Sequence, residues 1–243
     1  MRRCAVCTVI LHVPETAGEP VRLLAVRDED PTRDWQPLGA WWPDRPGVVG
    51  VRDVRAGGAW LAADATAGRL AVLLNRASPP VPDGMRQISR GGIVLDAVCG
   101  RPPHPTPAVL GFNLVEVTAG SVTVTTWDGA AVRQTSVGSG VHMIAHDDLD
   151  DPRTARITAW HDAFAQASSR DDWERAWLDV LAQSARLGPD DDRAIIRDNR
   201  VHGYPTQSLL LCTASVGAAG VDVSYGELAR PGMWNEITLV PPV

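Results

Sequence analysis

The chain has 243 residues, 44% hydrophobic and 21% charged, which is typical of a globular protein large enough to bury a core. Its formal net charge is −6, from 23 basic and 29 acidic residues, so we expect no nucleic-acid partner. There is no apolar run of about eighteen residues and no signal-peptide cleavage pattern, which predicts a cytoplasmic protein without a membrane span.

The first part of the chain is predicted to be mainly β-structure. Apolar, β-branched runs bounded by turn residues predict strands over 5–13, 22–27, 59–63, 70–75, 111–118, 121–127, 132–137 and 140–144. One helix is predicted over 90–99, with Ser89 as its N-cap. Pro-rich loops are predicted over 31–46, 78–82 and 101–107.

The segment 151–187 is predicted to be helical, with a break near 168–170 and an end at Gly188-Pro189. Three tryptophans fall on its apolar face, which predicts core positions for Trp160, Trp173 and Trp177. Strands over 209–214 and 221–225 close the chain. Because there is no repeat and no long linker, we expect one α+β domain over 1–243, with helices covering stacked sheets.

The cysteines carry the clearest chemical signal. Cys4 and Cys7 form a C-x-x-C, but residues three apart on a strand point to opposite faces, and no second ligand pair is present, so we expect no metal site. Cys99 and Cys212 lie in apolar segments and are predicted to be buried thiols. Cys7 opens an apolar strand, and an Arg27-Asp28 pair follows. This layout is typical of N-terminal-nucleophile amide hydrolases, in which the thiol attacks and its own α-amine is the base.

With further motifs, the chain resembles the transport and Golgi organisation family, also named after its Asn-Arg-Asp-Glu motif. The resemblance is carried, in order, by Cys7-Thr8, Val26-Arg27-Asp28-Glu29, Gly50-Val51-Arg52-Asp53, Gly57-Gly58-Ala59-Trp60-Leu61, Leu74-Asn75-Arg76, Ser89-Arg90-Gly91 and Gly111-Phe112-Asn113-Leu114. The segment 142–146, followed by Leu149, is a weaker match. The sequence departs from the family at Val26, usually Asn, and at Ala145-His146, usually Ser-Asn.

The resemblance implies a four-layer αββα sandwich, as in bile salt hydrolases and penicillin V acylases. It implies Cys7 as nucleophile, with Arg27 beside it to favour the thiolate. It further implies that Asp28 orients the α-amine and that Asn75 is an oxyanion-hole donor. His146 stands where the family has an asparagine, so either it donates a hydrogen bond in its place or the site is altered.

Arg52, Trp60 and Asn113 are the candidate substrate-binding residues. Each has a structural alternative: Arg52 either faces the pocket or clamps a loop, Trp60 packs after a tight Gly-Gly turn, and Asn113 bonds backbone at a strand start. Likewise, Arg27 and Asp28 could form a structural ion pair, and Asn75 could end a strand. Hydrolase relatives also carry an arginine near 203–206, where the nearest arginine of this chain is Arg200.

Two functions follow from the resemblance. The first is a cysteine hydrolase or acyltransferase that acts on a small amide and needs no cofactor. The second is a non-catalytic protein that binds or carries haem or an acyl lipid, in which His12, His142, His146 or His202 would ligate the haem iron. Neither the substrate nor the oligomeric state is readable from the sequence.

The residues before Cys7 matter because the α-amine mechanism requires Cys7 to be N-terminal. Arg2 should block removal of Met1. Self-cleavage between Val6 and Cys7 would free the amine, and so would initiation at Val6 followed by methionine removal. All 23 basic residues are arginine, which indicates a GC-rich bacterial genome of the kind that often uses valine start codons. Our hypothesis is initiation at Val6, in which case residues 1–6 would be absent from the working protein; whether Cys7 becomes the N-terminal residue is not readable from the sequence.

Overall fold

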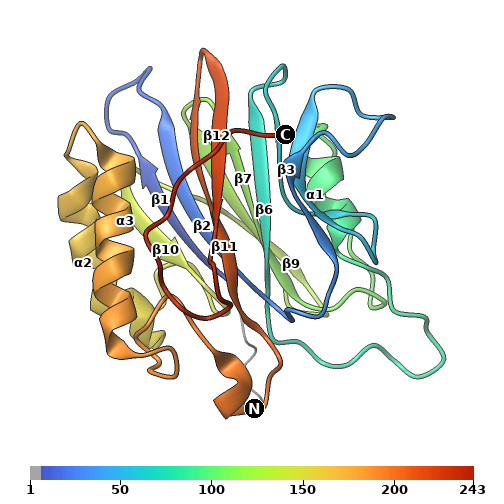
Figure 1. Cartoon of the computed structure of the whole chain (residues 1–243). Helices are drawn as coiled ribbons and strands as arrows, with labels where there is room; N and C mark the ends of the chain where they lie inside the picture. Colours follow the sequence, from blue (N-terminus) through green and yellow to red (C-terminus); the bar gives the residue numbers. More distant parts are fainter. Residues whose placement is uncertain (1–6) are drawn as a thin grey trace.

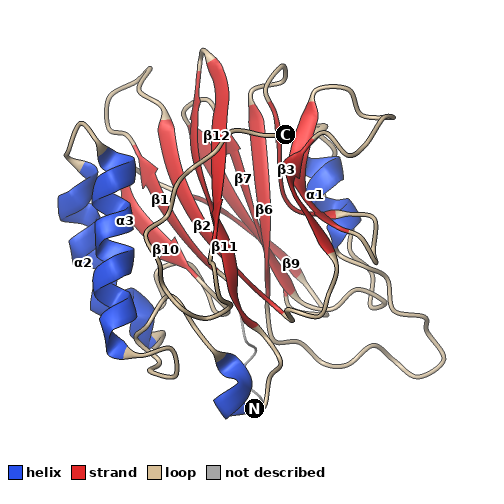
Figure 2. Ribbon diagram, in the orientation of Figure 1, coloured by secondary structure: helices blue, strands red, loops and turns tan. Residues whose placement is uncertain are grey.

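The structure is a computed structural model that describes residues 7–243. Within this range the chain is α+β and consists mostly of strands, arranged in two antiparallel sheets with three α-helices (Figures 1 and 2). The first sheet has five strands in the order β10 (Gly140–Ile144), β1 (Thr8–Val13), β2 (Val21–Glu29), β11 (Gln207–Gly217) and β12 (Gly220–Glu227).

The second sheet has seven strands that are adjacent in chain order. They are β3 (Trp35–Gly39), β4 (Val48–Asp53), β5 (Ala59–Asp64), β6 (Arg69–Asn75), β7 (Phe112–Thr118), β8 (Ser121–Trp127) and β9 (Val132–Ser136). The helices are α1 (Gly91–Val98), α2 (Ala155–Ser168) and α3 (Trp173–Ser184).

The two sheets pack face to face, and helices cover their outer faces. Figure 1 shows α2 and α3 on one side of the molecule and α1 on the other. Strand alternation builds the layers: Val9 and Leu11 belong to the core between the sheets, whereas Ile10 belongs to the cluster under α2 and α3. Trp177, fully buried, is the largest residue of that helix cluster, as its helical spacing predicts.

The α1 helix lies close to the backbone of the seven-stranded sheet because two glycines meet there. A Cβ built on Gly58 would lie 2.5 Å from the Cα of Gly91, the first residue of α1. Gly57, just before, has a φ of 70°, as expected for a tight turn. The Gly57-Gly58 pair therefore both turns the chain and admits the helix.

Three sequence expectations need correction. The predicted loop over 31–46 contains β3, an edge strand that tolerates Pro37 because its register with β4 is interrupted between Gln36 and Gly39. The α1 helix begins one residue later than expected, so Arg90 is at the N-cap position, although the Ser89 hydroxyl still accepts the N–H of Gly91 at 3.3 Å. Cys99 is exposed, because it follows the last helical residue and no longer faces the sheet.

β4 (Val48–Asp53) was not among the predicted strands, whereas the remaining element predictions agree well. The break between α2 and α3 lies at 169–172, and α3 passes through a 3₁₀ turn to Gly188, whose φ is 86°. Among residues 7–243, no helix has both the length and the apolar character needed to span a membrane.

Candidate functional site

Cys7 lies immediately before β1, at the end of the five-stranded sheet where β2 finishes. Thr8 is paired with Val26, so the antiparallel register carried one step further sets Cys7 opposite Arg27. The thiol is 5% exposed. Its sulfur accepts the N–H of Asp28 at 3.4 Å, and the S–H is 3.8 Å from the carbonyl oxygen of Asp28. The predicted nucleophile and the predicted Arg-Asp pair are therefore in direct contact.

Burial sets the acidity of this thiol. Desolvation, reinforced by the nearby Asp28 carboxylate, raises the pKa of Cys7 to about 12, although the Asp28 N–H and the Arg27 guanidinium oppose the shift. At neutral pH the sulfur is therefore protonated. A base that takes the thiol proton is needed before Cys7 can act as a nucleophile.

Arg27 lies on the inner face of β2, between the two sheets. Its side chain is almost fully buried; Nη2 is 3.6 Å from Glu29 Oε2, and the guanidinium stacks over Trp35 at 5.9 Å from the ring centroid. Burial lowers the pKa of Arg27, an effect opposed by Glu29 and Cys7. Its Nη1 is buried and has no hydrogen-bond partner. Because a buried unpaired N–H is unfavourable, this donor is available to a bound acceptor.

Trp60 supplies a second buried donor in the same inter-sheet core. On β5, Leu61 pairs with Val51 and Ala59 pairs with Arg52, so Trp60 is the extra residue of a β-bulge. The bulge directs the Trp60 side chain into the core that also contains Cys7. Its indole N–H is buried and unpartnered. Arg27 and Trp60 thus leave two N–H groups unused in the cluster that holds the thiol.

Asp28 points to the opposite face of β2, toward the helices. Its Oδ1 accepts the hydroxyl of Ser208 at 2.6 Å, and its Oδ2 accepts the amide of Asn199 at 3.5 Å. Burial raises the pKa of Asp28 to about 6, against the opposing influence of Arg156, Ser208 and Arg197. Asp28 is therefore a buried acid with a pKa near neutral pH, and its own backbone contacts the thiol.

Two buried arginines complete this side of the site. Arg156, on α2, donates from Nη1 to the hydroxyl of Thr8 at 2.9 Å, so it binds the residue that follows Cys7. Arg197 donates from Nε to Asn199 Oδ1 at 3.0 Å and from Nη2 to Asp192 at 3.1 Å. Burial lowers the pKa of Arg156 to about 10. Both guanidinium groups place positive charge near Asp28.

No sequence pattern pointed to Arg156, and only an indirect one pointed to Arg197. The family resemblance implies an arginine in this region of the chain, and Arg200 is the nearest to the expected position. In the structure, Arg200 is exposed and bonded to Asp198, with Nη2 at 2.6 Å from Oδ2. The buried arginine of this loop is Arg197, three residues earlier.

The other predicted residues lie at the same end of the molecule but not all on the inner face. Asn113, fully buried, donates to the carbonyl oxygens of Ala145 and Asp147 at 3.4 and 2.8 Å, and so holds the backbone on both sides of His146. His146 Nε2 is 3.3 Å from Asp147 Oδ2.

Asn75 and Arg52 lie on the outer face of the seven-stranded sheet. Asn75 is paired with Phe112, a member of the cluster under α1, so their side chains share that face. Arg52 follows Val51 of the inter-sheet core and donates to Gln36 at 3.1 Å, on the face away from Cys7. The structure therefore brings together Cys7, Arg27 and Asp28, places Trp60 in the same inter-sheet core as Cys7, and sets Asn75 and Arg52 on the other face of the seven-stranded sheet.

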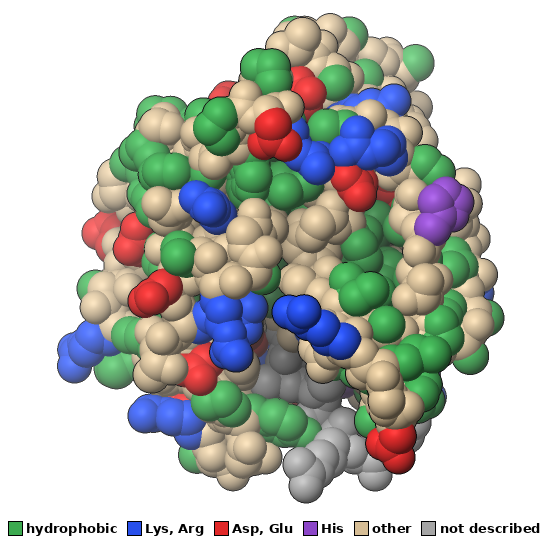
Figure 3. Space-filling model, turned by 90° about the vertical axis from the view of Figure 1, so that its right-hand side faces the viewer, with side chains coloured by type: hydrophobic (Ala, Val, Ile, Leu, Met, Phe, Trp, Pro, Cys, Tyr) green, Lys and Arg blue, Asp and Glu red, His purple; other side chains and the backbone are tan. Residues whose placement is uncertain are grey.

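No cluster of three or more histidine, cysteine or acidic side chains within residues 7–243 has a metal-binding arrangement. On the face shown in Figure 3, acidic and basic side chains are interspersed. The chemistry that this site offers is that of a thiol, a buried carboxyl and unpaired N–H donors.

Comparison with known proteins agrees with the motifs. The family model described as "Transport and Golgi organisation 2" matches residues 6–208, which include Cys7, Arg27, Asp28, Trp60 and Arg197. A search of curated proteins finds no match.

Proposed function

Because the chain belongs to the Transport and Golgi organisation 2 family, with Cys7 and its neighbours inside the matched region, we propose that it is a cysteine hydrolase or acyltransferase of the N-terminal-nucleophile type. Its substrate is a small amide. One observation carries the proposal: the Cys7 thiol contacts the backbone of Asp28 and is buried on the inter-sheet face where Arg27 and Trp60 have unpaired N–H donors. The order of layers, helices, sheet, sheet and helix, supports the αββα fold of such hydrolases.

In this mechanism the α-amine of Cys7 is free and takes the proton from Sγ. The thiolate attacks the amide carbonyl, and the C–N bond of the substrate breaks as the α-ammonium returns the proton to the leaving amine. Water, activated by the same amine, then hydrolyses the thioester; an acceptor amine in its place makes the enzyme an acyltransferase. The pKa of about 12 explains why Cys7 needs a base so close to it.

The residues around Cys7 take distinct roles. Asp28, held by Ser208 and Asn199, binds the α-ammonium and keeps it oriented. The unpaired N–H groups of Arg27 and Trp60 donate hydrogen bonds to the negative oxygen of the tetrahedral intermediate. Buried donors that have no partner in the free enzyme are suited to this role. Asn113 and His146 have a structural role in the adjoining loop and do not contact the reacting atoms.

The mechanism requires that residues 1–6 are absent from the active form, either because translation begins at Val6 or because the bond before Cys7 is cleaved. Intact mass spectrometry of the protein from its native source tests this directly. A mass that begins at Cys7 supports the proposal, and a mass that begins at Met1 in an active preparation contradicts it.

Catalytic competence is tested with two proteins, the full chain and a chain that begins at Cys7, both with Cys99→Ser because Cys99 is exposed. Each is treated with p-nitrophenyl acetate and analysed by peptide mass spectrometry. We expect an acetyl thioester on Cys7 in the short chain, much less in the full chain, and none after Cys7→Ala. A folded short chain that never acylates at Cys7 would contradict the proposal.

The haem-carrier alternative has less support from the histidines. Both ring nitrogens of His142 are engaged, by Asp150 at 2.7 Å and by the carbonyl of Gly138 at 3.1 Å. His202 Nε2 lies 3.3 Å from Arg197 Nη2 and from the carbonyl of Asp190. Haem titration with a Soret shift that a histidine substitution removes would favour this alternative.

A further inference from the structure

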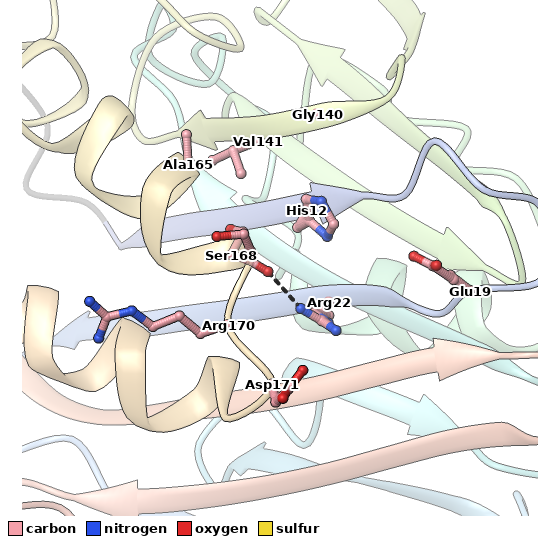
Figure 4. Close-up of a pocket in the computed structure, with 10 residues that line it drawn as sticks. His12, Glu19, Arg22, Gly140, Val141, Ala165, Ser168, Arg170 and Asp171 are labelled. Carbon is pink, nitrogen blue, oxygen red and sulfur yellow. Dashed lines mark hydrogen bonds between the residues drawn. The ribbon is translucent and has the colours of Figure 1, made fainter.

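A cavity lies on the helix side of the five-stranded sheet, at the end remote from Cys7. It has a volume of about 400 Å³, within the range of small-molecule sites. His12 is one of its lining residues (Figure 4). Because His12 follows Cys7 by five residues along an extended strand, the two are about 17 Å apart. This cavity, the His12 pocket, is therefore separate from the candidate catalytic site.

The wall of the pocket is a row of side chains across three strands. Val141 on β10 is paired with His12 on β1, and His12 with Arg22 on β2, so the three share one face. The end of α2 and the loop that follows it cross above this row, and Arg22 Nη1 donates to the carbonyl of Ser168 at 2.8 Å (Figure 4). The guanidinium also stacks over Trp173, at 5.7 Å from the ring centroid.

These contacts fix Arg22 but use only one of its N–H groups for a hydrogen bond, so others are left for a ligand. His12 adds a second unused polar atom: its Nδ1 is buried and has no hydrogen-bond partner. Burial and the positive charge of Arg22 lower the pKa of His12, so the imidazole is neutral at physiological pH. The inner part of the pocket therefore presents one cation and one neutral ring that can donate or accept, which suits a carboxylate.

The rim carries the opposite charge. Glu19 and Asp171 are exposed acids that line the pocket. In Figure 4 Glu19 lies to the right of His12 and Arg22, and Asp171 lies below Arg22. Arg170 also lines the pocket, but its side chain extends away from His12 and Arg22. A dianion such as phosphate would meet two carboxylates at the rim, and a simple amine would meet Arg22 inside. A ligand with an inner carboxylate and an outer ammonium satisfies both.

We infer that the His12 pocket binds a free α-amino acid or a short peptide, with its carboxylate on Arg22 and His12 and its ammonium group facing Glu19 and Asp171. The inference does not depend on catalysis by Cys7. The Val141 side and the small side chain of Ala165 leave room for an apolar side chain, so leucine is a suitable probe.

The test is isothermal titration of the full chain with L-leucine, leucinamide, N-acetyl-leucine and inorganic phosphate. We expect saturable binding of leucine, and we expect each of the other three compounds to bind more weakly by about tenfold or more. Leucinamide lacks the carboxylate, N-acetyl-leucine lacks the ammonium group, and phosphate has negative charge where leucine has the ammonium group. No saturable binding of leucine overturns the inference. Equal or tighter binding of N-acetyl-leucine or phosphate also overturns it, because the site would then be a simple anion site.

Variants locate the ligand. Arg22→Gln should weaken leucine binding by about tenfold or more, whereas Arg186→Gln, a control at an exposed arginine that does not line the pocket, should change it by less than about twofold. Equal effects of the two would overturn the assignment. Should Arg22→Gln lose its thermal unfolding transition, the wild-type His12 ring signals in a ¹H–¹⁵N spectrum provide the second readout, and they must shift on addition of leucine. Cys7→Ala should bind leucine normally; loss of binding there would place leucine at Cys7 instead.

Discussion

Asp28 gives the sharpest quantitative expectation. Burial raises its pKa from 3.8 to about 6, so between these pH values the unfolded carboxyl has lost its proton while the folded one retains it. The folded state then binds more protons, and the free energy of unfolding falls as pH rises. A difference of about two pH units corresponds to about 3 kcal/mol, since each unit is worth about 1.4 kcal/mol. The free energy of unfolding is lowered by this full amount above the pKa of the folded state and is not lowered below about pH 4.

The perturbation is Asp28→Asn, which keeps an oxygen for Ser208 but cannot ionise. Urea unfolding of both proteins between pH 4 and pH 7.5 gives the difference in unfolding free energy at each pH, in which all other titrating groups cancel. We expect the variant to gain about 3 kcal/mol relative to wild type across this range. A difference that stays constant within about 0.5 kcal/mol would refute the assignment of Asp28 as a buried acid.

Two further proteins make the measurement specific. Asp128 accepts the N–H groups of Ala130 and Ala131, which lowers its pKa, so Asp128→Asn should show a pH dependence of the opposite sign. In a chain that begins at Cys7, the new α-ammonium should lower the Asp28 pKa, and the pH dependence should shrink. An unchanged profile would mean that the ammonium does not reach Asp28.

Three other expectations follow. Gly58→Ala forces a Cβ against the α1 backbone and should destabilise the fold by about 1–3 kcal/mol, whereas Gly92→Ala meets nothing and should stabilise it by about 0.5–1 kcal/mol; chemical unfolding checks both. Arg197→Ala should cost about 3–5 kcal/mol, and Arg200→Ala less than about 1 kcal/mol, so equal losses would contradict their different burial. Trp60→Phe keeps an aromatic ring but removes the N–H, and the rate of Cys7 acylation in the short chain should fall by about 100-fold. Because the smaller ring also leaves space in the core, the rate is compared only where the variant keeps a cooperative unfolding transition.

Local patterns in the sequence were sufficient for most of the fold. Period-two runs predicted β1, β6, β7 and β8, and helical spacing predicted the α2–α3 pair with its break, because burial of one face imposes these periods on the chain. They failed at β3, where Pro37 masks an edge strand, and at β4, for which no strand was predicted. They also failed at Cys99, where one residue beyond a helix end changes the direction of the side chain. The failures at β3 and Cys99 occur where a proline or a helix end interrupts a local pattern.

For the candidate site, the sequence by itself determined the family, the cysteine and the Arg27-Asp28 pair that accompanies it. They could be found because they belong to one set of motifs that follow each other in a fixed order along the chain. Only the tertiary structure decided which face each residue occupies: the bulge that turns Trp60 inward and the pairing that turns Asn75 outward depend on register with neighbouring strands. Arg156 and Arg197 reach Asp28 from parts of the chain far away in sequence, and their approach follows from how α2 and the loop before β11 pack on the five-stranded sheet. No local pattern encodes such an approach, because it depends on the packing of whole layers.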